Sequence, residues 1–126
     1  MKILGIDYGR RKIGVAISQG TLAEPLYVIR YKDAEKMIAH IKRIIEKQKV
    51  EKVVVGVSEG EMAIESKEFA KNFNAETFDE TLSSHDAINM SIASGMGRKK
   101  RKEMEDAFAA SIMLQNYIDS KNGIKA

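Results

Sequence analysis

The chain of 126 residues contains no cysteine and no tryptophan, and it has a single proline. Without cysteine it cannot form disulfides, ligate an iron–sulfur cluster or hold zinc through thiolates, and this absence weakly favours a reducing compartment. No run approaches the roughly 18 apolar residues that a membrane-spanning helix needs. The N-terminal stretch lacks the basic and apolar regions of a signal peptide, so the sequence predicts a cytoplasmic protein without a membrane segment.

Apolar residues make up 44% of the chain and charged residues 31%, which is ordinary for a globular protein. The length predicts one domain over residues 1–126 with a core of its own. The net charge is only +3, but the bases gather at residues 10–12 and 98–102. Such runs commonly contact polyanions, although a solvated loop is the ordinary explanation for a run of like charges.

The hydrophobic pattern predicts an α/β fold. Period-two stretches and turn signals predict strands at residues 2–7, 12–18, 24–31, 52–57 and 75–79. Helical spacing predicts helices from the N-cap Asp33 to about residue 49 and over residues 61–73, 84–93 and 103–120. The first three strands should form an antiparallel meander, and the later strands alternate with helices and should be parallel. The prediction is a mixed five-stranded sheet flanked by helices.

Three carboxylates fall at matching places in this order. Asp7 ends the first strand, Glu80 follows the last strand, and Asp106 lies in the first turn of the predicted C-terminal helix. The carboxyl ends of parallel strands meet at one edge of a sheet, where open α/β sheets bind ligands. Converging carboxylates repel one another unless a hard cation such as Mg²⁺ or Mn²⁺ lies between them. Two such ions can act on a phosphodiester, so the pattern indicates a metal-dependent nuclease.

Each acid also has an ordinary explanation. Asp7 with Gly9 can form a turn through its own backbone hydrogen bonds, and Glu80 can be a surface residue of a loop. Asp106, beside Glu103 and Glu105, can be favoured by the helix dipole alone. The metal-site interpretation therefore depends on the three acids occurring together.

The bases supply a rim for a polyanion. A basic turn follows Asp7, and Gly14, inside a strand, allows a phosphate or another backbone to approach closely. His40 lies among charged residues and is expected to face solvent, whereas His85 is expected near a helix start. Contacts to nucleic acid are predicted for the eight clustered bases: Arg10, Arg11, Lys12, Arg98, Lys99, Lys100, Arg101 and Lys102.

Four stretches together resemble the YqgF/RuvX family. They are LGIDYGRRKIGVAIS at 4–18, KVVVGVSEG at 52–60, FDETLSSHDA at 78–87 and EDAFAASIMLQNYI at 105–118. The resemblance spans nearly the whole chain. It implies an RNase H-like fold in which Asp7, Glu80 and Asp106 bind Mg²⁺ or Mn²⁺ and catalyse phosphodiester hydrolysis. The implied substrate is a Holliday junction or other branched DNA, cut by a homodimer, or alternatively structured RNA at the 5′ end of a ribosomal RNA precursor.

The chain departs from the family pattern beside its acids. Thr81 replaces an arginine next to Glu80, and the loop after Gly56 is short. These changes leave a second hypothesis open, a nucleic-acid-binding module without catalysis. A third, a phosphotransferase of the actin and sugar-kinase type, is disfavoured because the chain lacks the second glycine-rich phosphate loop of that class.

Overall fold

The computed structural model describes residues 1–79 and 97–121. Its strands are β1 (Ile3–Asp7), β2 (Lys12–Ser18), β3 (Ala23–Arg30), β4 (Lys52–Val57) and β5 (Glu76–Asp79). Its helices are α1 (Ala34–Gln48), α2 (Glu61–Lys71) and α4 (Arg98–Lys121). None of these helices is both long and apolar enough to cross a membrane. The helix predicted over residues 84–93 lies outside the described residues.

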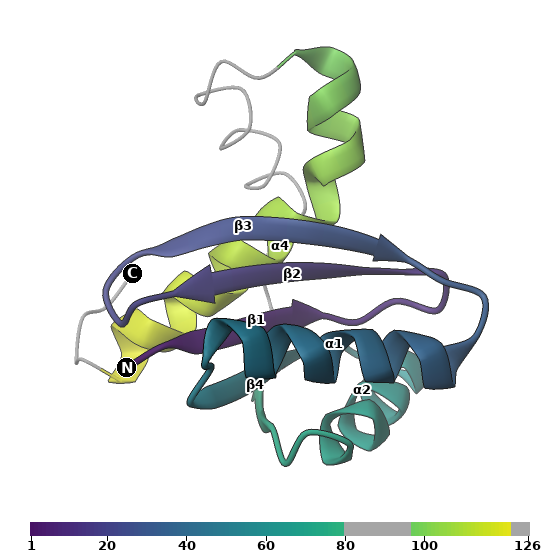
Figure 1. The fold of residues 1–126 in the computed structure, drawn as a ribbon, viewed down its shortest axis with the longest axis horizontal. Coiled ribbons are helices and arrows are strands. Elements are labelled where there is room, and N and C mark those ends of the chain that lie inside the picture. Colours follow the sequence, from purple (N-terminus) through teal and green to yellow (C-terminus); the bar gives the residue numbers. More distant parts are fainter. Residues whose placement is uncertain (80–96, 122–126) are drawn as a thin grey trace.

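The five strands form one mixed sheet in the order β3-β2-β1-β4-β5 (Figure 1). Strand β2 is antiparallel to β1 and β3, whereas β4 is parallel to both β1 and β5. The predicted meander and the parallel strands that follow it are therefore confirmed. Because β1, β4 and β5 run in the same direction, their carboxyl ends lie at one end of the sheet.

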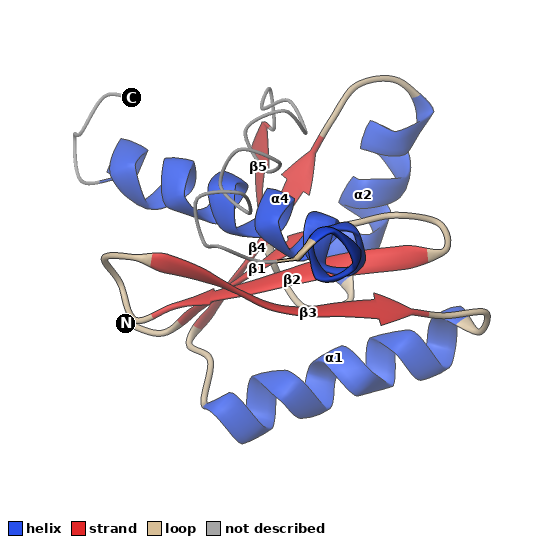
Figure 2. Cartoon of the chain, turned by 90° about the horizontal axis from the view of Figure 1, so that it is seen from above, coloured by secondary structure: helices blue, strands red, loops and turns tan. Residues whose placement is uncertain are grey.

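Helices cover both faces of the sheet, and α1 and α4 lie on opposite sides of it (Figure 2). On one face, buried Leu4 and Ile6 of β1 belong to the core that includes Ile41 of α1 and Phe69 of α2. On the other face, the strand residues pack against Leu114 and its neighbours in α4. Two covered faces explain why β4 reads KVVVGV, without alternation of apolar and polar residues.

Helix α4 begins at Arg98, so the prediction that the helix starts at residue 103 was wrong. The basic run forms its first turns because lysine and arginine are good helix formers. Lys99 and Lys102 also precede Glu103 and Asp106 at helical spacings that bring opposite charges together. An exposed helical segment has no apolar stripe, and hydrophobic periodicity therefore does not reveal it.

The first part of α4 projects from the sheet, and the rest lies across it. In Figure 1 the green start of the helix rises above β3, and in Figure 2 the same part is seen end-on. Burial follows this change of direction, because Ala107 is the first buried residue among the side chains of α4 that the structure describes. We call residues 98–105 the basic arm.

Candidate active site

Asp7 ends β1 on the face of the sheet that α4 covers. Gly5, two residues earlier, lies on that face, because a Cβ there would be 2.9 Å from the Leu114 Cβ. Asp7 pairs with Gly14 of β2 on one side and with Gly56 of β4 on the other. Directly opposite residues share a face, so the two positions directly opposite Asp7 carry no side chain.

Asp106 lies near Asp7 because α4 packs directly on Gly14. A Cβ on Gly14 would lie 1.9 Å from the backbone carbonyl oxygen of Asp106, and only a glycine fits under this turn of α4. The sequence allowed either a phosphate or another backbone to approach Gly14 closely, and in the structure the backbone of α4 does so. Since Asp7 pairs with Gly14 and Asp106 lies over it, the fold brings these two predicted acids together.

The side chain of Asp106 is only partly satisfied. Its Oδ2 atom is buried and has no hydrogen-bond partner. The Nζ of Lys12 lies 3.0 Å from that oxygen. The contact between Lys12 and Asp106 has the distance of an ion pair but not the geometry of a hydrogen bond. A buried carboxylate oxygen without a hydrogen bond fits a divalent cation, which prefers such oxygens as ligands.

Glu80, the third predicted acid, lies outside the described residues. It follows β5 directly in the sequence, and β5 pairs with β4 up to Val57 and Asp79. Within residues 1–79 and 97–121, no three acidic or histidine side chains are grouped closely enough to hold a metal ion. A complete metal site thus stays a prediction that depends on Glu80.

Arg10, predicted to contact phosphate, is held by α2. Its Nε donates to both carboxylate oxygens of Glu65, at 3.1 and 3.0 Å, and its Nη2 forms an ion pair with the same group. Glu61 lies 3.7 Å from that nitrogen. The hydrogen bond from Arg10 lowers the pKa of Glu65, and the same bond raises the pKa of Arg10. Arg10 therefore anchors the turn after Asp7 to α2.

Aromatic contacts fix the same turn. The Tyr8 ring lies 4.8 Å from the Phe69 ring, centroid to centroid. The Tyr31 hydroxyl donates to the Gly9 carbonyl at 2.6 Å, and the Tyr31 amide donates to the Arg11 carbonyl at 3.0 Å. Burial, followed by contact with Tyr8, raises the pKa of Tyr31 to about 12. The residues that follow Asp7 are consequently held from α2 and from the end of β3.

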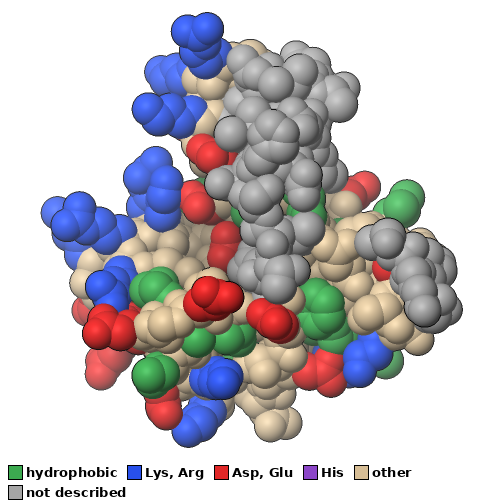
Figure 3. All heavy atoms as spheres, turned by 180° about the vertical axis from the view of Figure 1, so that it is seen from behind, with side chains coloured by type: hydrophobic (Ala, Val, Ile, Leu, Met, Phe, Trp, Pro, Cys, Tyr) green, Lys and Arg blue, Asp and Glu red, His purple; other side chains and the backbone are tan. Residues whose placement is uncertain are grey.

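The remaining predicted bases flank the acids. Arg11 is exposed, and Lys12 is paired with Asp106. Four side chains of the basic arm are exposed, those of Arg98, Lys99, Lys100 and Lys102, whereas the Arg101 side chain is not among those described. Figure 3 shows basic side chains on the projecting part of α4 and at the neighbouring edge, with acidic side chains between the two groups.

Sequence reasoning missed Glu65 and Tyr31, which hold the turn in place. Neither residue lies in a motif, and each is far from the turn in the sequence. Arg10 and Lys12 were predicted to contact nucleic acid, and in this structure each contacts an acid of the protein itself.

Comparison with known sequences shows the family. A family model described as "RuvX: Holliday junction resolvase" matches residues 1–120. A Halothermothrix orenii protein named "Putative pre-16S rRNA nuclease" is 38% identical over 136 residues, covering 97% of each chain. A Chloroflexus aggregans protein of the same name is also 38% identical and covers 94% of each chain.

Comparison with solved structures shows the fold. T. thermophilus RuvC in complex with a Holliday junction substrate superposes with a TM-score of 0.60 at 15% identity, covering 98% of this chain and 96% of its own. Fowlpox virus resolvase in complex with Holliday junction DNA gives 0.64 at 16% identity, covering 96% and 99%. The chain therefore has a RuvC-like RNase H fold and belongs to the RuvX family.

Proposed function

We propose that this protein is a divalent-metal-dependent nuclease that acts on the 5′ region of a precursor of 16S ribosomal RNA. The observation that carries the proposal is the meeting of Asp7 and Asp106 at Gly14. The choice of RNA is supported by the relatives named as pre-16S rRNA nucleases, which match nearly the whole chain.

Asp7, Asp106 and Glu80 would hold Mg²⁺ or Mn²⁺. The buried oxygen of Asp106, which lacks a hydrogen bond, supports this assignment. When bound, such ions neutralise the carboxylates and the phosphodiester and activate water for its hydrolysis. In our proposal the turn held by Arg10 and Tyr31 keeps the Asp7 carboxylate in place for this chemistry.

The bases around the acids would position the substrate. Arg11 and the Arg98, Lys99, Lys100 and Lys102 side chains of the basic arm are exposed, and they would contact phosphates flanking the cleaved bond. Lys12 would neutralise Asp106 in the protein without metal. Such contacts set the register of the strand and do not read its sequence.

The test compares the wild-type protein with Asp7→Asn in Mg²⁺ or Mn²⁺ at low salt. The substrates are an RNA with a 5′ extension of 16S rRNA, a four-way DNA junction and a linear DNA duplex. We expect the wild type to cut the RNA, and Asp7→Asn to lose cleavage while it retains the circular dichroism spectrum and RNA binding. Equal cleavage by the two proteins would refute the catalytic role of Asp7. RNA binding without any metal-dependent cleavage would favour the non-catalytic binding module.

A second candidate is the resolution of branched DNA, which was the first interpretation of the sequence. One observation favours it, the description of the matching family as a Holliday junction resolvase. One active site cuts one strand, so symmetric cutting would require a homodimer. Paired nicks in the junction, together with a dimer in sedimentation, would support this candidate over the RNA substrate.

A further inference from the structure

A second basic site lies on the α1 side of the sheet, between the end of β3 and the first half of α1, whereas the candidate acids lie on the α4 side. A cavity of about 420 Å³ opens there. The residues that line it include three cations, Lys32, Lys36 and Arg43, and the imidazole of His40. Arg30 borders the cavity from β3, with its side chain on the other face of the sheet. Neither the sequence motifs nor the proposed catalytic chemistry uses this group.

The helix presents three of these side chains as a stripe. Lys36, His40 and Arg43 follow at i, i+4 and i+7, and residues at these spacings lie on one face of a helix. Each is exposed, whereas Met37 and Ile41, the next residues along the chain after Lys36 and His40, are buried in the core. Packing of the core face thus fixes the direction in which the basic stripe points.

Most of the positive charge of the cavity has no acidic partner in the part of the chain that the structure describes. Among the ion pairs of the described residues, none involves the cationic side chains of Arg30, Lys32, Lys36 or Arg43. The one acid in the lining is Asp33, and its carboxylate accepts from the amides of Glu35 and Lys36 at 2.9 and 3.3 Å. Three cations against one carboxylate leave the cavity with an excess of positive charge, which suits a polyanion.

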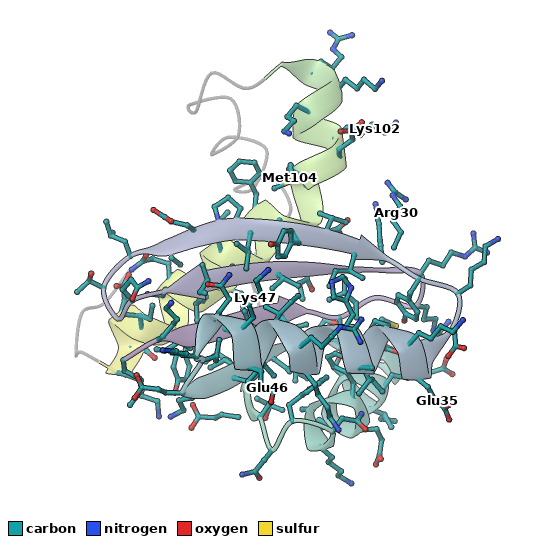
Figure 4. The ribbon with its side chains drawn as sticks, viewed as in Figure 1. Arg30, Glu35, Glu46, Lys47, Lys102 and Met104 are labelled. Atoms are coloured by element: carbon teal, nitrogen blue, oxygen red, sulfur yellow. The ribbon has the colours of Figure 1, made fainter. Side chains whose placement is uncertain are left out.

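One lining residue of the cavity, Tyr31, contacts the turn that follows Asp7. Arg30 pairs with Lys12 across β2 and β3, so it lies next to the base that contacts Asp106. The amide of Tyr31 donates to the Arg11 carbonyl. Figure 4 shows Arg30 at the end of β3, at the same edge of the sheet as the basic arm with Lys102. Bases thus extend from the acids, past the edge strand, to α1.

We propose that this cavity binds the phosphate backbone of the RNA substrate at a point away from the cleaved bond. The inference depends on the proposed function for the identity of the strand, while the cavity and its charges stand independently of it. Several separate cations suit a chain of phosphates better than one small anion, because each can neutralise a different phosphate. The cavity would hold the RNA in register while its neighbouring segment lies at the acids.

The test measures RNA binding by fluorescence anisotropy in EDTA, so that cleavage plays no part. The cavity variant is Lys32→Gln/Lys36→Gln/Arg43→Gln. The matched control, Lys42→Gln/Lys47→Gln/Lys67→Gln, loses the same charge from exposed side chains outside the cavity. All six residues are exposed, so both variants should keep the thermal unfolding temperature of the wild type.

We expect the cavity variant to bind a 30-nucleotide RNA roughly 10- to 100-fold more weakly at about 0.1 M salt. The slope of log K against log salt should fall by about 2, since each phosphate contact contributes about 0.7 for a single strand. The control should stay within about threefold of the wild type. In the wild type, RNA should also shift the His40 ring signal, assigned by its loss in His40→Gln.

Equal losses in the cavity variant and the control would overturn the proposal, because general charge would then explain the binding. An unchanged salt slope, or a His40 signal that moves with inorganic phosphate but not with RNA, would overturn it as well. Failure of the proposed nuclease function would be seen separately, as an absence of cleavage in the Asp7→Asn comparison with metal present.

Discussion

Gly14 of β2 lies so close beneath Asp106 of α4 that a Cβ on the glycine would be 1.9 Å from the Asp106 carbonyl oxygen. The same glycine pairs with Asp7 across β1 and β2. One residue without a side chain thereby sets the distance between the helix and the strand that carry the two acids. The proposed site depends on this packing as much as on the acids themselves.

Gly14→Ala should therefore impair both stability and the site. The Cβ cannot be accommodated without moving α4 or β2, because the obstacle is backbone, and we expect a loss of about 2–4 kcal/mol in the free energy of unfolding. Urea denaturation at neutral pH measures this loss. Gly97→Ala is the control, since its Cβ meets nothing within 4 Å. Equal stability of the two variants would contradict the close packing.

Lys12→Met should strengthen metal binding. Lys12 contacts the same Asp106 oxygen that we assign to the metal, so the ammonium group and a divalent cation compete for it. The pair is partly exposed and screened by water, and we therefore expect only a three- to fivefold lower Kd for Mn²⁺, or about 1 kcal/mol. Calorimetric titration of Mn²⁺ into the protein without nucleic acid provides the measurement.

The control for that experiment is Arg11→Met, which removes the neighbouring exposed base. It should leave the Kd for Mn²⁺ close to the wild-type value. If Lys12→Met binds Mn²⁺ no better than Arg11→Met does, Lys12 does not compete with the metal.

The contact between Arg10 and Glu65 predicts a pH dependence of stability. The hydrogen bond from Arg10 lowers the pKa of Glu65 from its ordinary 4.5. Because the pKa is lower in the folded than in the unfolded chain, the contact stabilises the fold above about pH 4.5, and this stabilisation is lost as the pH falls through the lowered pKa. Glu65→Gln should thus be less stable than the wild type at pH 7, and the difference should shrink in acid.

Urea midpoints at pH 7 and at about pH 3 measure this difference. Glu68→Gln is a suitable comparison, because Glu68 lies on the same helix and pairs with Lys71 at 3.0 Å on the exposed surface. A constant difference between the wild type and Glu65→Gln at both pH values would show that the charge of Glu65 does not contribute.

The basic arm should bind nucleic acid without supporting the fold. Its side chains at residues 98–100 are exposed and precede the first buried residue of α4. Arg98→Gln/Lys99→Gln/Lys100→Gln should therefore retain the unfolding temperature but bind RNA about tenfold more weakly, with a salt slope lower by about 2. Anisotropy titrations at several salt concentrations test this, and wild-type affinity in the variant would exclude the arm from the interface.

Several features could be predicted from the sequence because they are local. Apolar periodicity indicated all five strands and their order, and the change of period marked α1. The ends of strands are equally visible, so Asp7 could be identified as a residue at the carboxyl end of β1. The start of α4 could not be predicted in this way, because the basic arm is a helical segment without an apolar face.

The sequence by itself determined the succession of strands along the chain, the positions of the acids along the elements and the clusters of bases. Only the tertiary structure decided which groups meet: Asp106 over Gly14, Lys12 on Asp106, and Arg10 on Glu65. The physical reason is that periodicity reports which face of an element is buried, whereas an ion pair depends on the approach of side chains from distant parts of the chain. The basic cavity beside α1 likewise depends on the tertiary structure, since it forms only where the end of β3 meets that helix.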